Sequence, residues 1–298
     1  MSAGQSIDMA APAAEVPVRS PQSRRVPTVR KLFGLILPCA WLSLALLAAL
    51  LAPWLPIADP TEQDLLRMLQ PPEAGLWFGA DSLGRDVLAR TLFGLRVTFL
   101  VAVGAVCLGV LLGGLAGMMA GYFRGNVERL ILAANNVLMA FPPIVLTVAL
   151  MAYPGAPLPK VILALGLVFA SAFTRITRVN TMMFAQQDFV TAARAIGMRD
   201  MRIMAQEIVP NLVTPLLVFA LLMVAVAAVA EGTLSFLGLS VPPPTPTLGG
   251  MIASEVGSMR EAPHAVFFPA TVFFLTIFAL NRVGEYVQRQ LDVRESSA

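Results

Sequence analysis

Side chains that could carry out chemistry are scarce in this chain of 298 residues. It contains one histidine, His264, and two cysteines, Cys39 and Cys107, both within apolar stretches. A buried cysteine behaves as a small hydrophobic residue, and a single histidine argues against a histidine-based metal site. Neither of the two lysines follows a glycine, so the Gly-Lys-Ser/Thr end of a phosphate-binding loop is missing. We therefore expect no catalytic residue, no metal site and no cofactor bound by this chain.

One segment, DFVTAARAIG, has instead the pattern of a short helix that binds another protein. It begins with Asp188, a plausible N-cap, and ends with Gly197, a plausible residue just after a helix end. Phe189, Ala193 and Ile196 recur at i, i+4 and i+7 and so share one face. A short amphipathic helix of this kind is suited to docking in a groove of another protein.

Two amide residues, Asn135 and Asn136, lie within one apolar stretch, and the acidic Glu231 lies at the end of another. An amide inside a membrane is costly unless it is hydrogen-bonded. The asparagines therefore either bond to a neighbouring helix or line a solute pathway. Glu231 is either an outer-surface residue or part of a gate or pathway.

The composition indicates a membrane protein. Hydrophobic residues make up 57% of the chain and charged residues 13%, with a mean hydropathy of +0.75. Soluble domains carry about 25% charge, whereas helices in lipid need apolar side chains on their outer faces as well. The net charge of +3 does not indicate nucleic acid, because the basic residues do not gather in one patch.

Six apolar stretches are candidates for membrane helices, each of which needs about 20 residues. They are residues 32–58, 97–123, 130–159, 161–174, 212–230 and 262–281. Pro142 and Pro143 predict a kink in the third stretch. The fourth is short, between Lys160 and Arg175, whose long side chains can reach outward to the membrane surface. The sequence predicts an all-α membrane protein with six transmembrane helices.

The basic residues predict the orientation, because Lys and Arg favour the cytoplasmic side. With the N-terminus inside, 15 of the 21 basic residues lie inside, and both termini are cytoplasmic. The six outside are Arg67, Arg85, Arg90, Arg96, Lys160 and Arg260. The expected organisation is a disordered cytoplasmic tail (1–29), a first transmembrane helix (30–58), an external segment (59–95), a transmembrane core (96–290) with a cytoplasmic loop (179–211) and an external loop (232–261), and a cytoplasmic tail (291–298). In the external segment, Asp81, Arg85 and Asp86 either pair and cap a short helix or contact the solute.

Glycines recur every four residues along the second stretch. They are Gly109, Gly113, Gly117, Gly121 and Gly125. This spacing places them on one side of a helix, where a neighbouring backbone can approach closely. The neighbour is either another helix of this chain or another subunit.

The loop after the fourth stretch resembles the EAA loop of binding-protein-dependent ABC importer permeases. That pattern is Glu-Ala-Ala, three residues, Gly, and a Pro thirteen residues later; in the family the loop forms a coupling helix that sits in a cleft of the ATPase subunit. By this resemblance the matching residues are Ala192, Ala193, Arg194, Gly197 and Pro210. Together with Phe189 and Ile196 they make up the expected ATPase-coupling site. Thr191 stands where the pattern has Glu and lacks the carboxylate that could form a salt bridge with the ATPase.

Other stretches resemble the dipeptide, oligopeptide and nickel branch of this family, in its C-type permease subunit. They are the segment from Trp77 to Arg90, Phe141-Pro142, Leu234 to Leu239 and Pro243 to Pro246. The resemblance implies a type I ABC importer permease fold in the bacterial inner membrane. It also implies a second, different permease subunit, two ATPase subunits that bind ATP and Mg, and an extracytoplasmic solute-binding protein. Peptides or related small solutes are the expected cargo.

An ion-coupled secondary transporter or channel subunit is the alternative function. Such carriers place acids, bases or histidines deep within the membrane. We expect none at mid-depth here, since Glu231 and Arg175 fall at the edges of the predicted spans. The spans likewise offer no nucleophile–base pair or metal set for an intramembrane enzyme.

Overall fold

The computed structural model describes residues 28–295, and the side chains of residues 35–290. This part of the chain is helical, with no β-strand. The expected disordered tail at 1–29 lies almost wholly outside the described residues. The expected tail at 291–298 is partly helical, because the last helix continues to Glu295.

Within residues 28–295, five helices are long and apolar enough to cross a membrane. They are built on α1 (Thr28–Leu51), α2 (Val87–Phe123), α5 (Pro157–Phe184), α8 (Val209–Phe236) and α10 (His264–Glu295). A sixth candidate span is the pair α3 (Gly125–Ala140) and α4 (Pro143–Met151), which together are long and apolar enough and are bent by 83° at the break between them. Proline removes a helical hydrogen bond and clashes with the preceding turn, so the kink predicted at Pro142 and Pro143 is confirmed.

Helices α2 and α5 extend well beyond the stretches predicted for them. Helix α2 begins at Val87 rather than Val97, because Asp86 caps it by accepting hydrogen bonds from the backbone N–H of Leu88 and Ala89. Helix α5 spans 28 residues rather than the predicted 161–174. Its charged inner half stays helical because Arg178 pairs with Glu128 of α3. The length of the charge-free stretch therefore underestimates the length of both helices.

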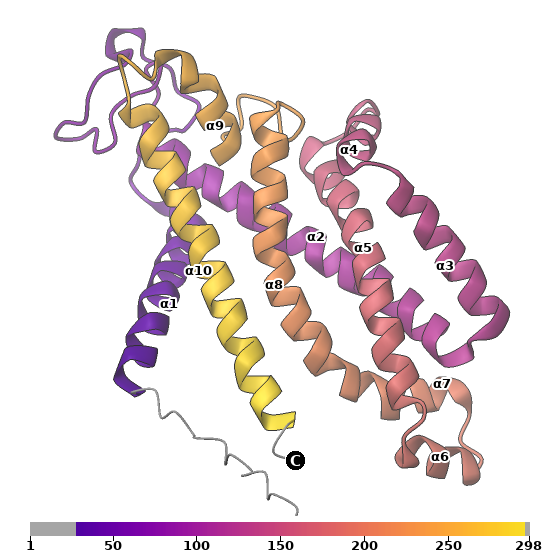
Figure 1. Ribbon diagram of the computed structural model, residues 1–298. Helices are drawn as coiled ribbons and strands as arrows, with labels where there is room; N and C mark the ends of the chain where they lie inside the picture. The colour runs from indigo at the N-terminus through magenta and orange to yellow at the C-terminus, as the bar shows by residue number, and fades with distance from the viewer. Residues whose placement is uncertain (1–27, 296–298) are drawn as a thin grey trace, which may run out of the picture.

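The helices run alternately between two ends of the bundle (Figure 1). The start of α1, the end of α10, and the short helices α6 (Asp188–Ala195) and α7 (Asp200–Ile203) lie at one end, called here the inner end. The segment 52–86 and helix α9 (Leu248–Glu255) lie at the opposite, outer end. The described helix ends thus agree with termini on the same side as the predicted coupling loop.

The core forms mainly where α2 lies along α5, with α8 against both. Val101, Val106, Leu165 and Phe173 are buried there. A second apolar cluster lies at the inner end, beneath α6 and α7. The second cluster includes Tyr122 of α2 and Leu212 of α8, so it fixes the inner loop relative to the membrane helices.

Candidate functional site: the inner loop and its connections to the bundle

Helix α6 ends in a Schellman motif. Gly197 has φ +80°, a conformation that favours glycine, and its N–H donates to the carbonyl of Arg194 at 3.0 Å. The N–H of Met198 donates to the carbonyl of Ala193 at 3.1 Å. These are the two bonds that define the motif, so the glycine stops the helix at a fixed place.

The start of α6 differs from the expectation. Gln187 is the N-cap residue and makes no side-chain capping bond, while Asp188 is the first helical residue. Asp188 still places a negative charge in the first turn and Arg194 a positive charge in the last turn. Both charges interact favourably with the helix dipole.

One face of α6 is packed against the rest of the bundle. Val190 and Ala193 are buried in the second apolar cluster, together with Ile203 of α7 and Ile208. Of the three residues predicted to share one face, Ala193 is thus buried against the bundle, whereas Phe189 and Ile196 are exposed. On a helix, residues i+3 and i+4 lie on opposite sides of residue i. The spacing from Phe189 therefore does not decide which of Ala192 and Ala193 faces the bundle.

The opposite face of α6 is exposed and carries apolar side chains. Ile196 is 79% exposed, Phe189 is 37% exposed, and Ala192 lies between them on the solvent side. Thr191 is exposed as well, and its hydroxyl donates to the Gln187 carbonyl at 3.4 Å. A side chain at the position of the family's Glu thus points away from the bundle.

Two contacts of Tyr122 join this loop to the end of α2. The Tyr122 hydroxyl donates to Asp200 Oδ1 at 2.6 Å. The guanidinium of Arg194 lies over the Tyr122 ring, 5.2 Å from its centroid. One aromatic side chain therefore contacts both α6 and α7. No motif indicated Tyr122 as a site residue, because its partners are far away along the chain.

Pro210 lies in the first turn of α8, directly after a π-helical segment, Met204–Ile208. Proline has no N–H to donate and its ring clashes with the carbonyl four residues earlier. Widening of the preceding turn avoids that clash; the N–H of Val209 accordingly reaches back to the Met204 carbonyl. Helix α7 runs through this segment into α8, so the loop continues directly into a membrane helix.

The glycine row of α2 faces α5. A Cβ built on Gly113 would lie 2.2 Å from the Ala170 carbonyl oxygen, and one on Gly117 would lie 2.4 Å from that of Thr174. Gly109 and Gly121 face the same helix, whereas nothing lies within 4 Å of Gly125. These four glycines thus support contact within the chain rather than between subunits.

The two asparagines of α3 have different surroundings. Asn136 Oδ1 accepts a 3.4 Å hydrogen bond from Arg175 Nη2 of α5, so this residue bonds between helices. Asn135 is buried and its amide contacts only Met139 Sδ, at 3.9 Å, within the same helix. Asn135 also lines a small groove of about 220 Å³ formed with α2 and α5.

Glu231 is fully buried, so its interpretation as an outer-surface residue is wrong. Helix α8 continues past it to Phe236. Its carboxylate accepts hydrogen bonds from Thr98 Oγ1 of α2 at 2.8 Å and from Ser240 Oγ at 3.3 Å. Helix α8 therefore contains a buried acid near its outer end, five residues before Phe236.

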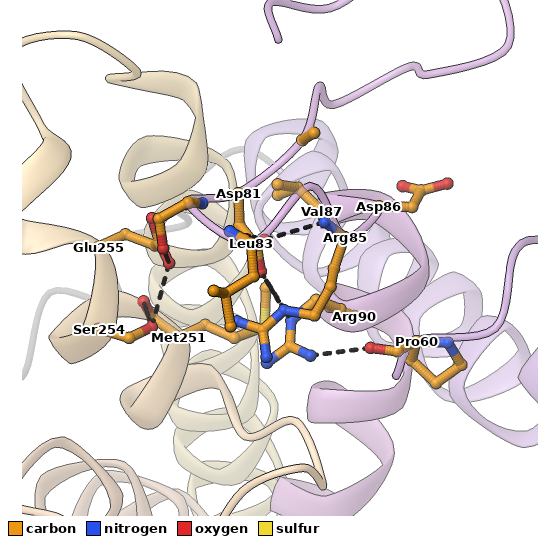
Figure 2. A network of polar contacts seen from close by, with 12 residues as sticks. Pro60, Asp81, Leu83, Arg85, Asp86, Val87, Arg90, Met251, Ser254 and Glu255 are labelled. Atoms are coloured by element: carbon orange, nitrogen blue, oxygen red, sulfur yellow. Dashed lines mark hydrogen bonds and ion pairs between the residues drawn. The ribbon is translucent and has the colours of Figure 1, made fainter. Parts of the chain in front are cut away.

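The outer segment is held by a buried ionic network (Figure 2). Asp81 Oδ2 lies 2.7 Å from Arg85 Nε and 3.3 Å from Arg90 Nε. Arg90 also donates to the Pro60 carbonyl at 2.8 Å. Asp81 and Arg85 are buried and Asp86 caps α2, which supports pairing and capping rather than solute contact. The helix that Asp86 caps is the long α2, not a short external one.

Glu255 of α9 completes the attachment of this segment. It accepts hydrogen bonds from the backbone N–H and the hydroxyl of Ser82, at 3.1 and 2.8 Å. The carboxylate is also bonded by the Ser258 hydroxyl at 3.0 Å. Glu255 therefore fastens the segment 52–86 to α9, and the sequence did not indicate it as a site residue.

The family described as "Binding-protein-dependent transport system inner membrane component" matches residues 109–296. The chain is 36% identical over 250 residues to the glutathione transport system permease protein GsiD of Escherichia coli, covering 84% of this chain and 82% of that protein. It is 33% identical over 234 residues to GsiD of Pectobacterium atrosepticum, covering 78% of each.

Solved structures share the fold at low sequence identity. An inward-facing structure of the MetNI methionine ABC transporter matches with a TM-score of 0.52 and 17% identity, covering 65% of this chain and 94% of that chain. The crystal structure of an amino acid ABC transporter with histidines matches with a TM-score of 0.51 and 15% identity, covering 68% and 94%.

Proposed function

The chain belongs to the family of binding-protein-dependent transport system inner membrane components, and we propose that it supplies half of a pathway that imports small peptides. It is a multi-pass inner-membrane permease subunit of an ABC importer. This family membership argues against an ion-coupled carrier. The alternative of a secondary transporter or channel subunit has no support from the relatives.

In the proposed mechanism, the exposed face of α6 docks on a partner ATPase subunit. Phe189, Ala192 and Ile196 present an apolar surface at the inner end, at the position that the EAA resemblance assigns to the coupling helix. Apolar side chains of this size contribute about 25 cal/mol per Å² removed from water. The exposed apolar face of α6 is the observation that carries the coupling assignment.

Force from the ATPase would then reach the membrane helices through short, fixed connections. The glycine-ended helix α6 is held to α2 by the contacts of Tyr122, and α7 continues into α8. A short capped helix moves as a rigid body. Movement of α6 would therefore shift α2 and α8 together and alternate the pathway between inward-facing and outward-facing states.

ATP and Mg belong to the partner ATPases in this proposal, since neither lysine of the chain stands in a phosphate-binding loop. The second permease is proposed to be a different chain, and an extracytoplasmic binding protein is proposed to deliver the solute at the outer end. The names of the relatives favour glutathione or a similar small peptide as the cargo. Asn135 and Glu231 are the proposed polar contributions to the pathway or its gate.

Cross-linking of the assembled transporter tests the coupling proposal. In a background with Cys39 and Cys107 replaced by alanine, Ile196→Cys should cross-link to the ATPase, whereas Leu65→Cys, exposed at the outer end, should not. Ile196→Asp should abolish solute-stimulated ATP hydrolysis without preventing membrane insertion. Cross-linking through Leu65→Cys instead, or normal transport by Ile196→Asp, would overturn the proposal.

The cargo needs a separate measurement. Reconstituted transporter should hydrolyse ATP faster when its binding protein carries glutathione or a dipeptide than when the binding protein is supplied with a free amino acid. Equal stimulation by the free amino acid would contradict the peptide assignment while leaving the coupling assignment intact.

A further inference from the structure

A groove between α1 and α10 is not used by the proposed mechanism. Its volume is about 570 Å³. It is lined by Leu37, Pro38 and Trp41 from α1 and by Leu275, Phe278, Ala279 and Arg282 from α10. Trp41 Nε1 donates to Thr276 Oγ1 at 3.2 Å, which holds the two helices together beside the groove. The walls are thus apolar, with one cation among the lining residues.

The groove lies at the level of the inner leaflet. Helix α10 starts at His264 at the outer end, and Arg282 follows eighteen residues later, about 27 Å along the helix at 1.5 Å per residue. The hydrocarbon core of a membrane is about 30 Å thick. Arg282 therefore lies near the boundary between hydrocarbon and cytoplasmic headgroups, and Trp41 and Leu275 lie toward the middle of the membrane.

The Arg282 guanidinium is placed to meet an anion. It is half exposed and lies over the Phe278 ring, 5.3 Å from the centroid, at the edge of the groove. Its pair with Glu285 is long, 3.7 Å, and exposed on both sides, so that pair contributes little. A guanidinium presents several N–H donors in a planar fork that fits phosphate oxygens.

We propose that this groove binds an anionic phospholipid of the inner leaflet, with an acyl chain between α1 and α10 and the headgroup phosphate on Arg282. An apolar slot with one cation at its cytoplasmic end matches the two parts of such a lipid, and basic pockets between membrane helices bind anionic headgroups in this way. The inference is independent of the cargo and of the coupling helix. A helix of another subunit is a competing occupant that the experiment distinguishes.

The test measures phospholipid retained by the complete transporter after purification in mild detergent, by mass spectrometry. Wild-type transporter should retain phosphatidylglycerol or cardiolipin above its proportion in the membrane, and Arg282→Gln should lower that retention severalfold. Arg289→Gln is the matched control, because Arg289 lies on the same helix, 3.6 Å from the same Glu285, and does not line the groove. It should retain the wild-type amount.

A second variant tests the apolar part of the site. Leu37 lines the groove and is 75% exposed, so Leu37→Trp adds bulk there without disturbing a buried position. It should lower retention of the lipid even though Arg282 is intact. The proposal is overturned if wild-type transporter shows no anionic enrichment, if Arg289→Gln loses as much lipid as Arg282→Gln, or if Leu37→Cys cross-links to another subunit with high yield.

Discussion

Tyr122 is the second-to-last residue of α2, and its hydroxyl donates a 2.6 Å hydrogen bond to the carboxylate of Asp200, the first residue of α7. The two residues are 78 positions apart, and their contact joins the inner end of the longest helix to the loop that precedes α8. A loop fixed only at its two chain ends could tilt without moving α2. While this hydrogen bond is intact, the loop cannot tilt without moving α2.

Tyr122→Phe should therefore weaken coupling while leaving the fold in place. A hydrogen bond to a charged group contributes about 1.5–3 kcal/mol, and the ring that contacts Arg194 remains. We expect solute transport per ATP hydrolysed to fall severalfold in proteoliposomes. Tyr286→Phe, on α10 and without a hydrogen bond from its hydroxyl in the described structure, is the control and should behave as wild type. Unchanged stoichiometry in Tyr122→Phe would show that the bond is not part of the coupling path.

Gly197→Ala should loosen the end of α6 for a purely conformational reason. No atom lies within 4 Å of a Cβ at this position, so there is no clash, but the backbone has φ +80°. A non-glycine residue in the left-handed region costs about 1–2 kcal/mol. We expect faster hydrogen exchange at Gly197 and Met198 and reduced solute-stimulated ATP hydrolysis. Gly257→Ala also has open space around it but no positive φ, and it should change neither quantity.

The membrane helices could be predicted because lipid selects on composition. Long charge-free stretches located the spans, and the pair Pro142–Pro143 located the break between α3 and α4. The end of α6 just before Gly197 could be predicted from local backbone chemistry. Such signals are contained in a few neighbouring residues, so one sequence is enough to read them.

The contacts between distant residues could not be predicted in the same way. Arg178 extends α5 because Glu128 of another helix neutralises it, and Glu231 is buried because Thr98 and Ser240 bond to it. Charge alone ended the fourth predicted stretch before Arg175 and the fifth before Glu231. Which side of α6 faces the bundle likewise depends on the second apolar cluster, in which residues of α6 pack with residues of α2, α7 and α8.

Gly113→Ala should separate α2 from α5. The added methyl group would lie 2.2 Å from the Ala170 carbonyl oxygen, which is backbone and cannot rotate away. Overpacking of this kind costs about 1–3 kcal/mol or more. We expect a lower unfolding temperature in detergent and a lower yield. Gly114→Ala is the neighbouring control, since nothing lies within 4 Å of its Cβ; equal stability of the two variants would contradict close helix contact at the glycine row.

Glu231 and Thr98 should act as a pair. Glu231→Ala leaves the buried Thr98 and Ser240 hydroxyls without an acceptor, which costs about 1–3 kcal/mol. Glu231→Gln keeps an acceptor oxygen and should lose less. The losses in unfolding free energy of Glu231→Ala and Thr98→Val should not add up in the double variant, because the second change removes a partner whose hydrogen bond is already lost. Additive losses would mean that the hydrogen bond contributes nothing measurable.

Asp81→Asn should be the most destabilising change at the outer end. It removes the carboxylate charge that faces both Arg85 and Arg90, which are 6% and 5% exposed, so two buried cations lose their shared partner. Breaking a buried pair in this way costs about 3–5 kcal/mol. The matched control is Asp64→Asn, whose pair with Arg67 at 3.2 Å is exposed and should contribute about 0–1 kcal/mol. Limited proteolysis of segment 52–86 reports on both, because detachment of this segment from α2 and α9 exposes its backbone. Rapid cleavage is expected for Asp81→Asn alone, and equal cleavage of the two variants would show that the buried network does not hold the segment in place.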